Sequence, residues 1–238
     1  MPDVLLAPAK LTRSLRITGV RADGYHLIDA EMVTVDLVDT LVFSAGDGLV
    51  LRGAGAEVPA DDRNLVRQAL HAAGRTALVE VTKAIPSGAG LGGGSTDAAA
   101  VLRWAGVVDV GVAATLGADV PFCMVGGRAR VTGVGEVVER LPFEARTFTL
   151  LTPPVHCSTL EVYRRWDDLG GPTGTGDNDL EPAALAVVPE LGRWRDELGD
   201  ASGAVPTLAG SGGTWFVEGA FPGPGRVVVD TLPAFGDA

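Results

Sequence analysis

The sequence predicts a globular protein of mixed α and β structure, built as one large domain or two small ones. The chain has 238 residues, which is enough for a substantial core. Its apolar fraction is 46%, and no long run of charge interrupts it. Alternating β-branched segments typical of strands occur beside Ala- and Leu-rich segments typical of helices. The most informative junction between the two types is a glycine-rich stretch at residues 86–97.

This glycine-rich stretch joins a predicted strand to a predicted helix. Residues 77–85 alternate and are rich in β-branched side chains, so they predict a strand. Residues 97–104 predict a helix that begins at Ser95, Thr96 or Asp97. The loop between them lets backbone N–H groups surround an anion, and the dipole of the following helix favours negative charge there. A phosphate group is therefore the predicted ligand.

Three other interpretations of the loop fit less well. The pattern Gly-x-Gly-x-x-Gly at 88–93 matches the dinucleotide fingerprint, with Asp109 near the expected acidic position. That fingerprint should open the first strand–helix unit of its fold, whereas about 80 residues precede it here. A Walker P-loop requires Gly-Lys-Ser/Thr, and residues 94–96 contain no lysine. A flexible linker is disfavoured because five glycines in seven positions separate the strand from the helix.

The charge of the chain restricts its partners. A formal net charge of −11 disfavours nucleic acid and anionic membranes. An anionic ligand must therefore be held by local positive groups and backbone amides. Lysine occurs only at positions 10 and 83, and the other basic side chains are arginine. Because lysine is a compact point charge and arginine a planar fork, these two lysines are candidates for a special role.

Targeting and metal-binding patterns are not evident. The N-terminus does not read as a signal peptide, and no apolar run approaches the ~20 residues of a membrane-spanning helix. A cytoplasmic protein is expected. Cys123 and Cys157 lie far apart and lack the spacing of a zinc site or of a disulfide scaffold. No residue is assigned as a metal ligand.

Further elements are predicted before the loop. Residues 4–11 predict a strand. Residues 31–38 and 40–43 alternate and predict two paired strands on either side of Asp39. Residues 61–73 predict a helix with an aspartate at its cap.

The loop resembles the ATP loop of the GHMP kinases, and in detail that of the 4-diphosphocytidyl-2-C-methyl-D-erythritol kinases. From Pro86 it reads Pro-x-Gly-x-Gly-Leu-Gly-Gly-Gly-Ser-Thr-Asp-Ala-Ala. Residues 7–11, Ala-Pro-Ala-Lys-Leu, resemble the first motif of the family, with Thr12 where asparagine is usual. Residues 21–26, Arg-x-Asp-Gly-Tyr-His, are the most specific match, because they resemble the cytidine-binding segment of these enzymes alone.

Two later segments extend the resemblance, which covers residues 4–216. Residues 116–122, Leu-Gly-Ala-Asp-Val-Pro-Phe, are similar to the family segment that carries the aspartate facing the acceptor hydroxyl. Residues 208–216 are similar to the third GHMP motif, although Ala209 and Gly213 stand where the family has serine.

The resemblance implies an α+β fold, the two-domain GHMP kinase fold, with the active site between the domains. Residues 1–147 would form the N-terminal domain with the ATP loop, and residues 148–238 a shortened C-terminal domain. The implied activity is ATP-dependent phosphorylation of the 2-hydroxyl of 4-diphosphocytidyl-2-C-methyl-D-erythritol, in non-mevalonate isoprenoid biosynthesis. ATP and Mg²⁺ would be the cofactors. The partner would be this small molecule, a cytidine diphosphate-linked methylerythritol, and the chain would bind neither nucleic acid nor a membrane. It would be a monomer or a weak homodimer.

The resemblance also assigns roles to residues. Lys10 and Asp119 would be catalytic, and Thr12, Tyr25 and His26 would bind the substrate. The implied nucleotide-binding residues are Pro86, Ser87, Gly88, Ala89, Gly90, Leu91, Gly92, Gly93, Gly94, Ser95 and Thr96.

Several alternatives stay open at this point. Either Ser95 or Thr96 would contact a phosphate or Mg²⁺. Asp119 would orient the acceptor hydroxyl, and whether it acts as a true general base is not decided by the sequence. The chain is either this kinase, another GHMP kinase of the sugar, homoserine or mevalonate type, or a non-catalytic ligand-binding relative.

Overall fold

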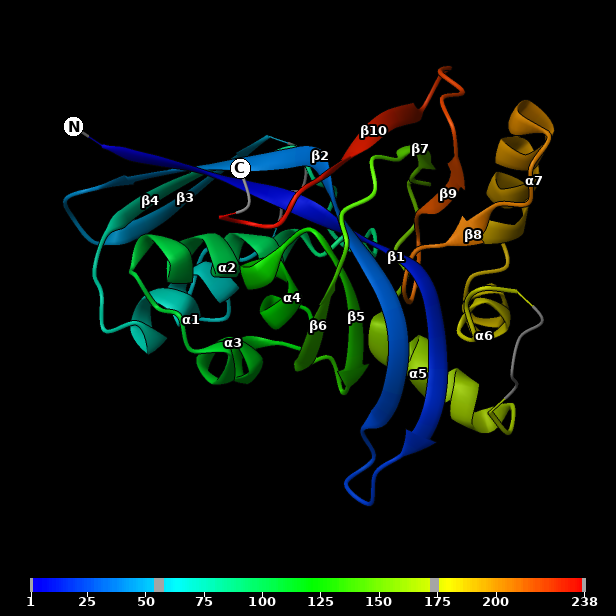
Figure 1. Ribbon diagram of the computed structural model, residues 1–238, viewed down its shortest axis with the longest axis horizontal. Coiled ribbons are helices and arrows are strands. Elements are labelled where there is room, and N and C mark those ends of the chain that lie inside the picture. Colours follow the sequence, from blue (N-terminus) through cyan, green and yellow to red (C-terminus); the bar gives the residue numbers. More distant parts are fainter. Residues whose placement is uncertain (1, 54–57, 172–175, 237–238) are drawn as a thin grey trace.

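The protein, described here from a computed structural model over residues 2–53, 58–171 and 176–236, contains a ten-stranded sheet with helices packed against it (Figure 1). The strands are β1 (Asp3–Val20), β2 (His26–Ser44), β3 (Gly48–Gly53), β4 (Leu78–Lys83), β5 (Arg128–Gly133), β6 (Val137–Leu141), β7 (Thr147–Leu151), β8 (Thr207–Leu208), β9 (Trp215–Glu218) and β10 (Arg226–Leu232). The main strand order is β3-β4-β2-β10-β7-β9-β8. In addition, β1 pairs with β2, and β5 pairs with both β2 and β6.

The helices form two groups. They are α1 (Leu65–Ala72), α2 (Gly93–Trp104), α3 (Val110–Leu116), α4 (Val120–Val125), α5 (Thr159–Asp168), α6 (Glu181–Val187) and α7 (Leu191–Ser202). Figure 1 shows α1 to α4 gathered on one side of the strands of the first half, and α6 and α7 beside β8 and β9. None of the described helices combines the length and apolar character needed to cross a membrane.

Strand β2 runs without a break through Asp39, so the prediction of two paired strands on either side of this residue is wrong. β2 instead pairs with β1 along almost its whole length, from Phe43 opposite Asp3 to His26 opposite Val20. Asp39 is 0% exposed. A buried aspartate does not end the strand here because its carboxylate is fully engaged by partners from another part of the chain, described below.

Two helices begin elsewhere than predicted. α2 starts at Gly93, earlier than the predicted start at Ser95 or beyond, because Gly92 takes the N-cap position with φ 71° and supplies no side-chain cap. α1 starts at Leu65, later than the predicted 61, because the side chain of Asn64 accepts the N–H of Val66 at 2.9 Å. The presence of both helices is confirmed.

The predicted strand at 4–11 lies within β1, and the predicted strand at 77–85 contains β4. Beneath β1, α2 presents the fully buried residues Ala98, Ala99 and Ala100, whose small side chains permit close packing. Thr96 reinforces the contact, since its hydroxyl donates to the Pro8 carbonyl at 2.7 Å. The glycine loop is thereby carried on the junction of one strand and one tightly packed helix.

The C-terminal strand connects the two halves of the chain. β10 pairs with β7 of the second half and, at Thr231 and Leu232, with β2 of the first half. Beyond it, the N–H of Phe235 donates to the Val125 carbonyl at 3.1 Å. The sheet is therefore continuous across both halves.

Candidate functional site

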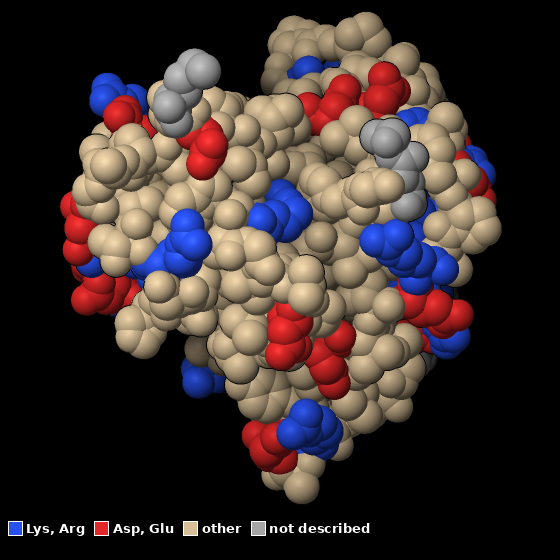
Figure 2. Space-filling model, turned by 60° about the vertical axis from the view of Figure 1, so that its left-hand side comes forward, with Lys and Arg blue, Asp and Glu red and all other residues tan. Residues whose placement is uncertain are grey.

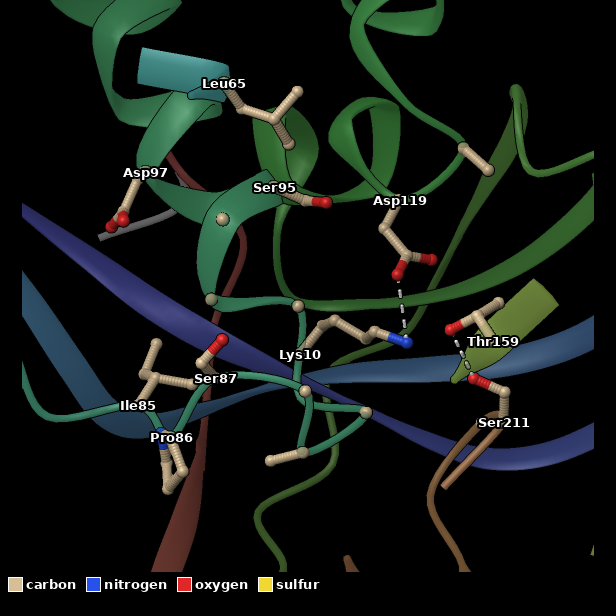
Figure 3. Close-up of a pocket in the computed structure, with 18 of the residues that line it drawn as sticks. Lys10, Leu65, Ile85, Pro86, Ser87, Ser95, Asp97, Asp119, Thr159 and Ser211 are labelled. Atoms are coloured by element: carbon tan, nitrogen blue, oxygen red, sulfur yellow. Dashed lines mark hydrogen bonds and ion pairs between the residues drawn. The ribbon is translucent and has the colours of Figure 1, made fainter. Parts of the chain in front are cut away.

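A cavity of about 520 Å³ is lined by the glycine loop and by residues from both halves of the chain (Figure 3). This volume suits a small-molecule ligand. Besides the loop, the first half contributes Lys10, Thr12 and Asp119 to the wall, and the second half contributes Thr159, Tyr163 and Ser211.

Lys10 and Asp119 form an ion pair at one end of the cavity, with 3.1 Å between Nζ and Oδ2. The backbone N–H of Lys10 donates to the Leu91 carbonyl at 3.1 Å, which places this strand residue beside the loop. Lys10 is 5% exposed, whereas the side chain of Asp119 is 31% exposed. The carboxylate therefore keeps a face open to a ligand while the ammonium is enclosed. The ammonium also donates to the Thr12 hydroxyl at 3.1 Å.

The loop is fixed by close contacts on both of its sides. Gly88, Gly90 and Gly92 have φ of 68°, 75° and 71°, a left-handed backbone that side chains disfavour. A Cβ on Gly90 would lie 2.4 Å from the Ala209 carbonyl oxygen, and one on Gly92 would lie 2.7 Å from Lys10 Cγ. Glycine is therefore required at these two positions both by conformation and by the lack of space.

The N-terminus of α2 faces the cavity with unsatisfied backbone N–H groups and a favourable dipole for an anion. Ser95 lies in this first turn, and its side chain points toward Asp119 (Figure 3). Thr96 and Leu91 are buried and do not line the cavity, and the Thr96 hydroxyl already donates to Pro8. Of the two candidates for a phosphate or metal contact, Ser95 is the one in position. The other predicted loop residues that line the cavity are Pro86, Ser87, Gly88, Ala89, Gly90, Gly92, Gly93 and Gly94.

A buried charge cluster lies under the loop. Lys83, the last residue of β4, donates to a carboxylate oxygen of Asp39 and, at 2.6 Å, to Oδ2 of Asp97. The other oxygen of Asp39 accepts the N–H groups of Ala84 at 2.6 Å and Ile85 at 2.9 Å. Burial raises the pKa of Asp97 to about 7, opposed by the attraction of Lys83 and assisted by the repulsion of Asp39. The cluster ties both ends of the loop, at Lys83 and Asp97, to the middle of β2.

Sequence reasoning assigned no role to several residues that line the cavity. Lys83 had a signal, since it is one of only two lysines in the chain. Ser211 falls in residues 208–216, which resemble a family motif, and its hydroxyl oxygen lies 2.8 Å from that of Thr159 (Figure 3). Tyr163 lies one helical turn after Thr159 on α5.

The predicted substrate-binding residues Tyr25 and His26 do not line this cavity themselves. Tyr25 is 62% exposed in the turn between β1 and β2. His26 Nε2 lies 2.8 Å from Asp167 Oδ1. Its ring centroid is 4.8 Å from that of Tyr163, which does line the cavity. His26 therefore adjoins the cavity through Tyr163, and the largely exposed ring of Tyr25 lies beside the Arg21 guanidinium, 5.9 Å from it.

Acidic and basic side chains are interspersed on the face shown in Figure 2, often in adjacent pairs. Among the described residues, Arg21 pairs with Asp23 at 2.6 Å and Arg130 pairs with Asp29 at 2.6 Å. The positive charge inside the cavity wall is thus a local feature of a chain with net charge −11.

Comparison with known proteins gives concordant results. Residues 63–127 match the family described as "GHMP kinases N terminal domain". The chain is 36% identical over 273 residues to the 4-diphosphocytidyl-2-C-methyl-D-erythritol kinase of Granulibacter bethesdensis, covering 98% of this chain and 90% of that protein. It is 37% identical over 250 residues to the enzyme of the same name from Ruegeria pomeroyi, covering 92% of this chain and 89% of the relative.

Solved structures agree. The chain matches a crystal structure of 4-(cytidine 5'-diphospho)-2C-methyl-D-erythritol kinase with a TM-score of 0.77 and 30% identity, covering 96% of this chain and 99% of that one. The mevalonate kinase of Methanococcus jannaschii matches with a TM-score of 0.53 at 13% identity, covering 92% of this chain and 90% of that one, and shares the fold alone.

Replacing Gly92 by valine should abolish ATP binding in a protein that still folds. The new side chain would both displace Lys10 and oppose the positive φ, so the loop and the first turn of α2 would lose their shape. ATP affinity is measured by titration calorimetry and folding by thermal melting. Gly74→Val is the matched control, because Gly74 has φ 60° but open space around a Cβ. ATP affinity unchanged in Gly92→Val would contradict a phosphate-binding role for the loop.

Proposed function

Because the chain belongs to the 4-diphosphocytidyl-2-C-methyl-D-erythritol kinases of the GHMP kinase family, we propose that it transfers the γ-phosphoryl group of ATP to the 2-hydroxyl of 4-diphosphocytidyl-2-C-methyl-D-erythritol. This step belongs to non-mevalonate isoprenoid biosynthesis. The observation that carries the proposal is the Lys10–Asp119 pair, which shares one cavity with the N-terminus of α2. In that arrangement the carboxylate of Asp119 would orient the acceptor hydroxyl, and the N-terminus of α2 would hold the phosphates of ATP in the same cavity.

The triphosphate would lie along the glycine loop, held by backbone N–H groups and the α2 dipole. Phosphoryl transfer depends on positioning and on stabilising charge rather than on covalent chemistry by the protein. The acceptor oxygen forms a bond to the γ-phosphorus as the bond from that phosphorus to the β–γ bridging oxygen breaks, and ADP leaves. Asp119 orients the acceptor hydroxyl and takes its proton. Lys10 holds the Asp119 carboxylate in place through the ion pair and offsets the charge on the transferring group.

Mg²⁺ fits this cavity as a phosphate-bound ion. Among the described residues, no group of three or more His, Cys, Asp or Glu side chains is arranged for a metal. Mg²⁺ commonly uses few protein oxygens together with substrate phosphates, so Ser95 would supply a protein oxygen beside the phosphates. When bound, the ion would neutralise charge on the triphosphate. Ser95 itself would orient the phosphates from the first turn of α2.

The cytidine end of the acceptor would lie toward α5 and the turn between β1 and β2. Tyr25 offers an exposed ring for stacking, and His26, held by Asp167, offers polar groups for the base edge. Thr12, on the same wall as Lys10, would contact the acceptor near the reacting hydroxyl. In this arrangement residues 1–147 hold the nucleotide, residues 148–238 complete the acceptor site, and the reaction takes place between them.

An acceptor panel tests the proposed activity. The purified chain is incubated with ATP, Mg²⁺ and one of 4-diphosphocytidyl-2-C-methyl-D-erythritol, homoserine, mevalonate or galactose, and ADP release is followed. Release only with the cytidylyl acceptor, and a new phosphate at its 2-oxygen by phosphorus NMR, is the expected result. Turnover of another acceptor alone would reassign the chain to a different GHMP kinase activity. Ligand binding without ADP release from any acceptor would identify a non-catalytic relative.

Replacing Asp119 by asparagine should lower kcat by roughly 10²–10⁴-fold with little change in ATP affinity. The amide keeps the shape of the side chain but neither accepts a proton nor attracts Lys10 by charge. Steady-state kinetics and calorimetry measure the two quantities. Asp109→Asn is the matched control, since Asp109 only caps α3 through the N–H of Gly111. A kcat close to that of the wild type would remove Asp119 from the mechanism.

Replacing Tyr25 by alanine should raise KM for the cytidylyl acceptor by about one to two decades, while KM for ATP barely moves. The ring is exposed, so its removal costs base stacking rather than packing. The variant Tyr25→Phe separates the role of the ring from that of the hydroxyl, because it keeps the ring alone. Its KM for the cytidylyl acceptor should equal that of the wild type if only stacking matters. Inhibition by free CMP should weaken in Tyr25→Ala. A lower melting temperature with an unchanged acceptor KM would instead mark Tyr25 as a packing residue.

A further inference from the structure

The side chains of β1 that face the cavity do not follow a simple alternation. Lys10 and Thr12 line the cavity, whereas Leu11 between them is fully buried in the core. Because successive side chains of a strand point to opposite faces, strict alternation would put Leu15 on the same face as Leu11. Leu15 nevertheless lines the cavity. The strand therefore changes phase between residues 12 and 15.

The change of phase is a β-bulge at Arg13. Thr12 of β1 is opposite Met32 of β2. Two residues further along β1, Ser14 is opposite Glu31, which is only one residue along β2. Arg13 is the extra residue, and a bulge of this kind bends its strand; β1 and β2 bend together in Figure 1. A slip of one residue here would turn the later side chains of β1 to the other face.

The side chain of Arg13 is held from both halves of the chain. Its Nη1 lies 2.5 Å from Oε1 of Glu31 on β2, directly at the bulge. Its Nη2 lies 3.9 Å from Oε2 of Glu218 on β9. The Cζ atom is 5.7 Å from the centroid of the Phe148 ring on β7, within the range of a cation–π interaction. Since a guanidinium has donors for two carboxylates at once, this side chain connects the bulge to the second half of the sheet.

The two glutamates belong to a closed ring of six charges of alternating sign. Arg128 of β5 pairs with Glu31 at 2.9 Å and also with Glu144. Arg146 pairs with Glu144 at 2.8 Å and with Glu218 at 2.6 Å, which closes the ring. The six side chains are between 18% and 48% exposed, so dissolved salt can screen them. A network of this kind fixes geometry better than isolated surface pairs do.

We propose that Arg13 is a positioning residue for the acceptor, because it pins the bulge that keeps the cavity-facing side chains of β1 in phase on both sides of it. The inference rests on the proposed function, in which Thr12 contacts the acceptor near the reacting hydroxyl. Arg13 acts through Thr12 and Leu15 and does not itself touch the ligand. The ring extends this control to β9, so the first strand keeps its place relative to the second half of the chain.

The ring permits a clean test, because removing Arg13 leaves no carboxylate of the ring without a partner. Glu31 keeps Arg128, and Glu218 keeps Arg146. Methionine is unbranched and can still pack on the Phe148 ring. Arg13→Met should therefore fold with a melting temperature close to that of the wild type. The matched control is Arg130→Met, which breaks a cross-strand pair with Asp29 on the same two strands, β5 and β2, outside the ring.

Arg13→Met should raise KM for 4-diphosphocytidyl-2-C-methyl-D-erythritol about 3- to 10-fold at 50 mM KCl, the effect of losing a network contact. The dissociation constant of ATP, measured by calorimetry, should stay within about twofold, because the glycine loop lies outside the bulge. Arg130→Met should change neither quantity. The ratio of KM in Arg13→Met to KM in the wild type should fall to within about twofold at 1 M KCl, since screening then removes in the wild type what the substitution removes. Taking the ratio at each salt concentration cancels the general effect of salt on a charged acceptor.

Hydrogen exchange gives a second measurement that does not depend on turnover. Amides of residues 9–17 should exchange faster in Arg13→Met than in the wild type or Arg130→Met, whereas those of β4 should not change. In the wild type, exchange of the same segment relative to β4 should rise between 50 mM and 1 M KCl. That comparison decides the question if Arg13→Met does not fold, and equal exchange at both salt concentrations would then refute the inference.

The remaining outcomes separate this inference from the proposed function. An unchanged acceptor KM in Arg13→Met, or an equal rise in Arg130→Met, would overturn the role of Arg13 and leave the kinase activity standing. A ratio of KM values that is the same at both salt concentrations would also overturn it, because a packing effect is not screened. If the wild type does not phosphorylate the acceptor, the proposed function fails, and with it the acceptor as the ligand that Arg13 serves. Faster exchange in Arg13→Met alone would then still support its hold on the bulge, and unchanged exchange would refute that as well.

Discussion

The close packing of the glycine loop between two other parts of the chain is the constraint on which the site depends. On one side, the loop approaches Lys10 so closely that a Cβ on Gly92 would lie 2.7 Å from its side chain. On the other side, a Cβ on Gly90 would collide with the Ala209 carbonyl. The lack of side chains therefore does two things at once. It exposes backbone N–H groups to an anion, and it lets the first strand and the third motif meet at the same cavity.

The loop, the ion pair and the approximate positions of the elements around them could be predicted from the sequence, because each is marked by a local pattern. Glycines between a strand and a helix indicate an anion site wherever they occur. Lys10 and Asp119 stand in short motifs that resemble those of a known family, and the structure places their side chains 3.1 Å apart. α2 starts two to four residues earlier than the sequence predicts, because no side chain caps it and Gly92 takes the N-cap position.

The uninterrupted course of β2 could not be predicted in the same way. An aspartate between two alternating segments usually marks a turn, and nothing near Asp39 contradicts that interpretation. What reverses it is Lys83, 44 residues later, together with two backbone N–H groups of the loop. The partners of a buried charge are set by tertiary structure, which a single sequence does not display. The exposed turn that carries Tyr25 is the opposite case, because its local Asp-Gly signal is sufficient to predict it.

Both lysines of the chain line the cavity, and the chemistry of their positions explains why arginine does not replace them. Lys10 extends beneath Gly92 to reach Asp119 and Thr12, and Lys83 is seated against Gly93 between two carboxylates. Each position holds one compact ammonium whose donors point in different directions. A planar guanidinium is larger and directs its donors within one plane, so it would press on the glycines that shape the loop. The two ammonium groups therefore have different surroundings in a chain of net charge −11: Lys10 pairs with the partly open Asp119 in the cavity wall, whereas Lys83 is committed to Asp39 and Asp97 beneath the loop.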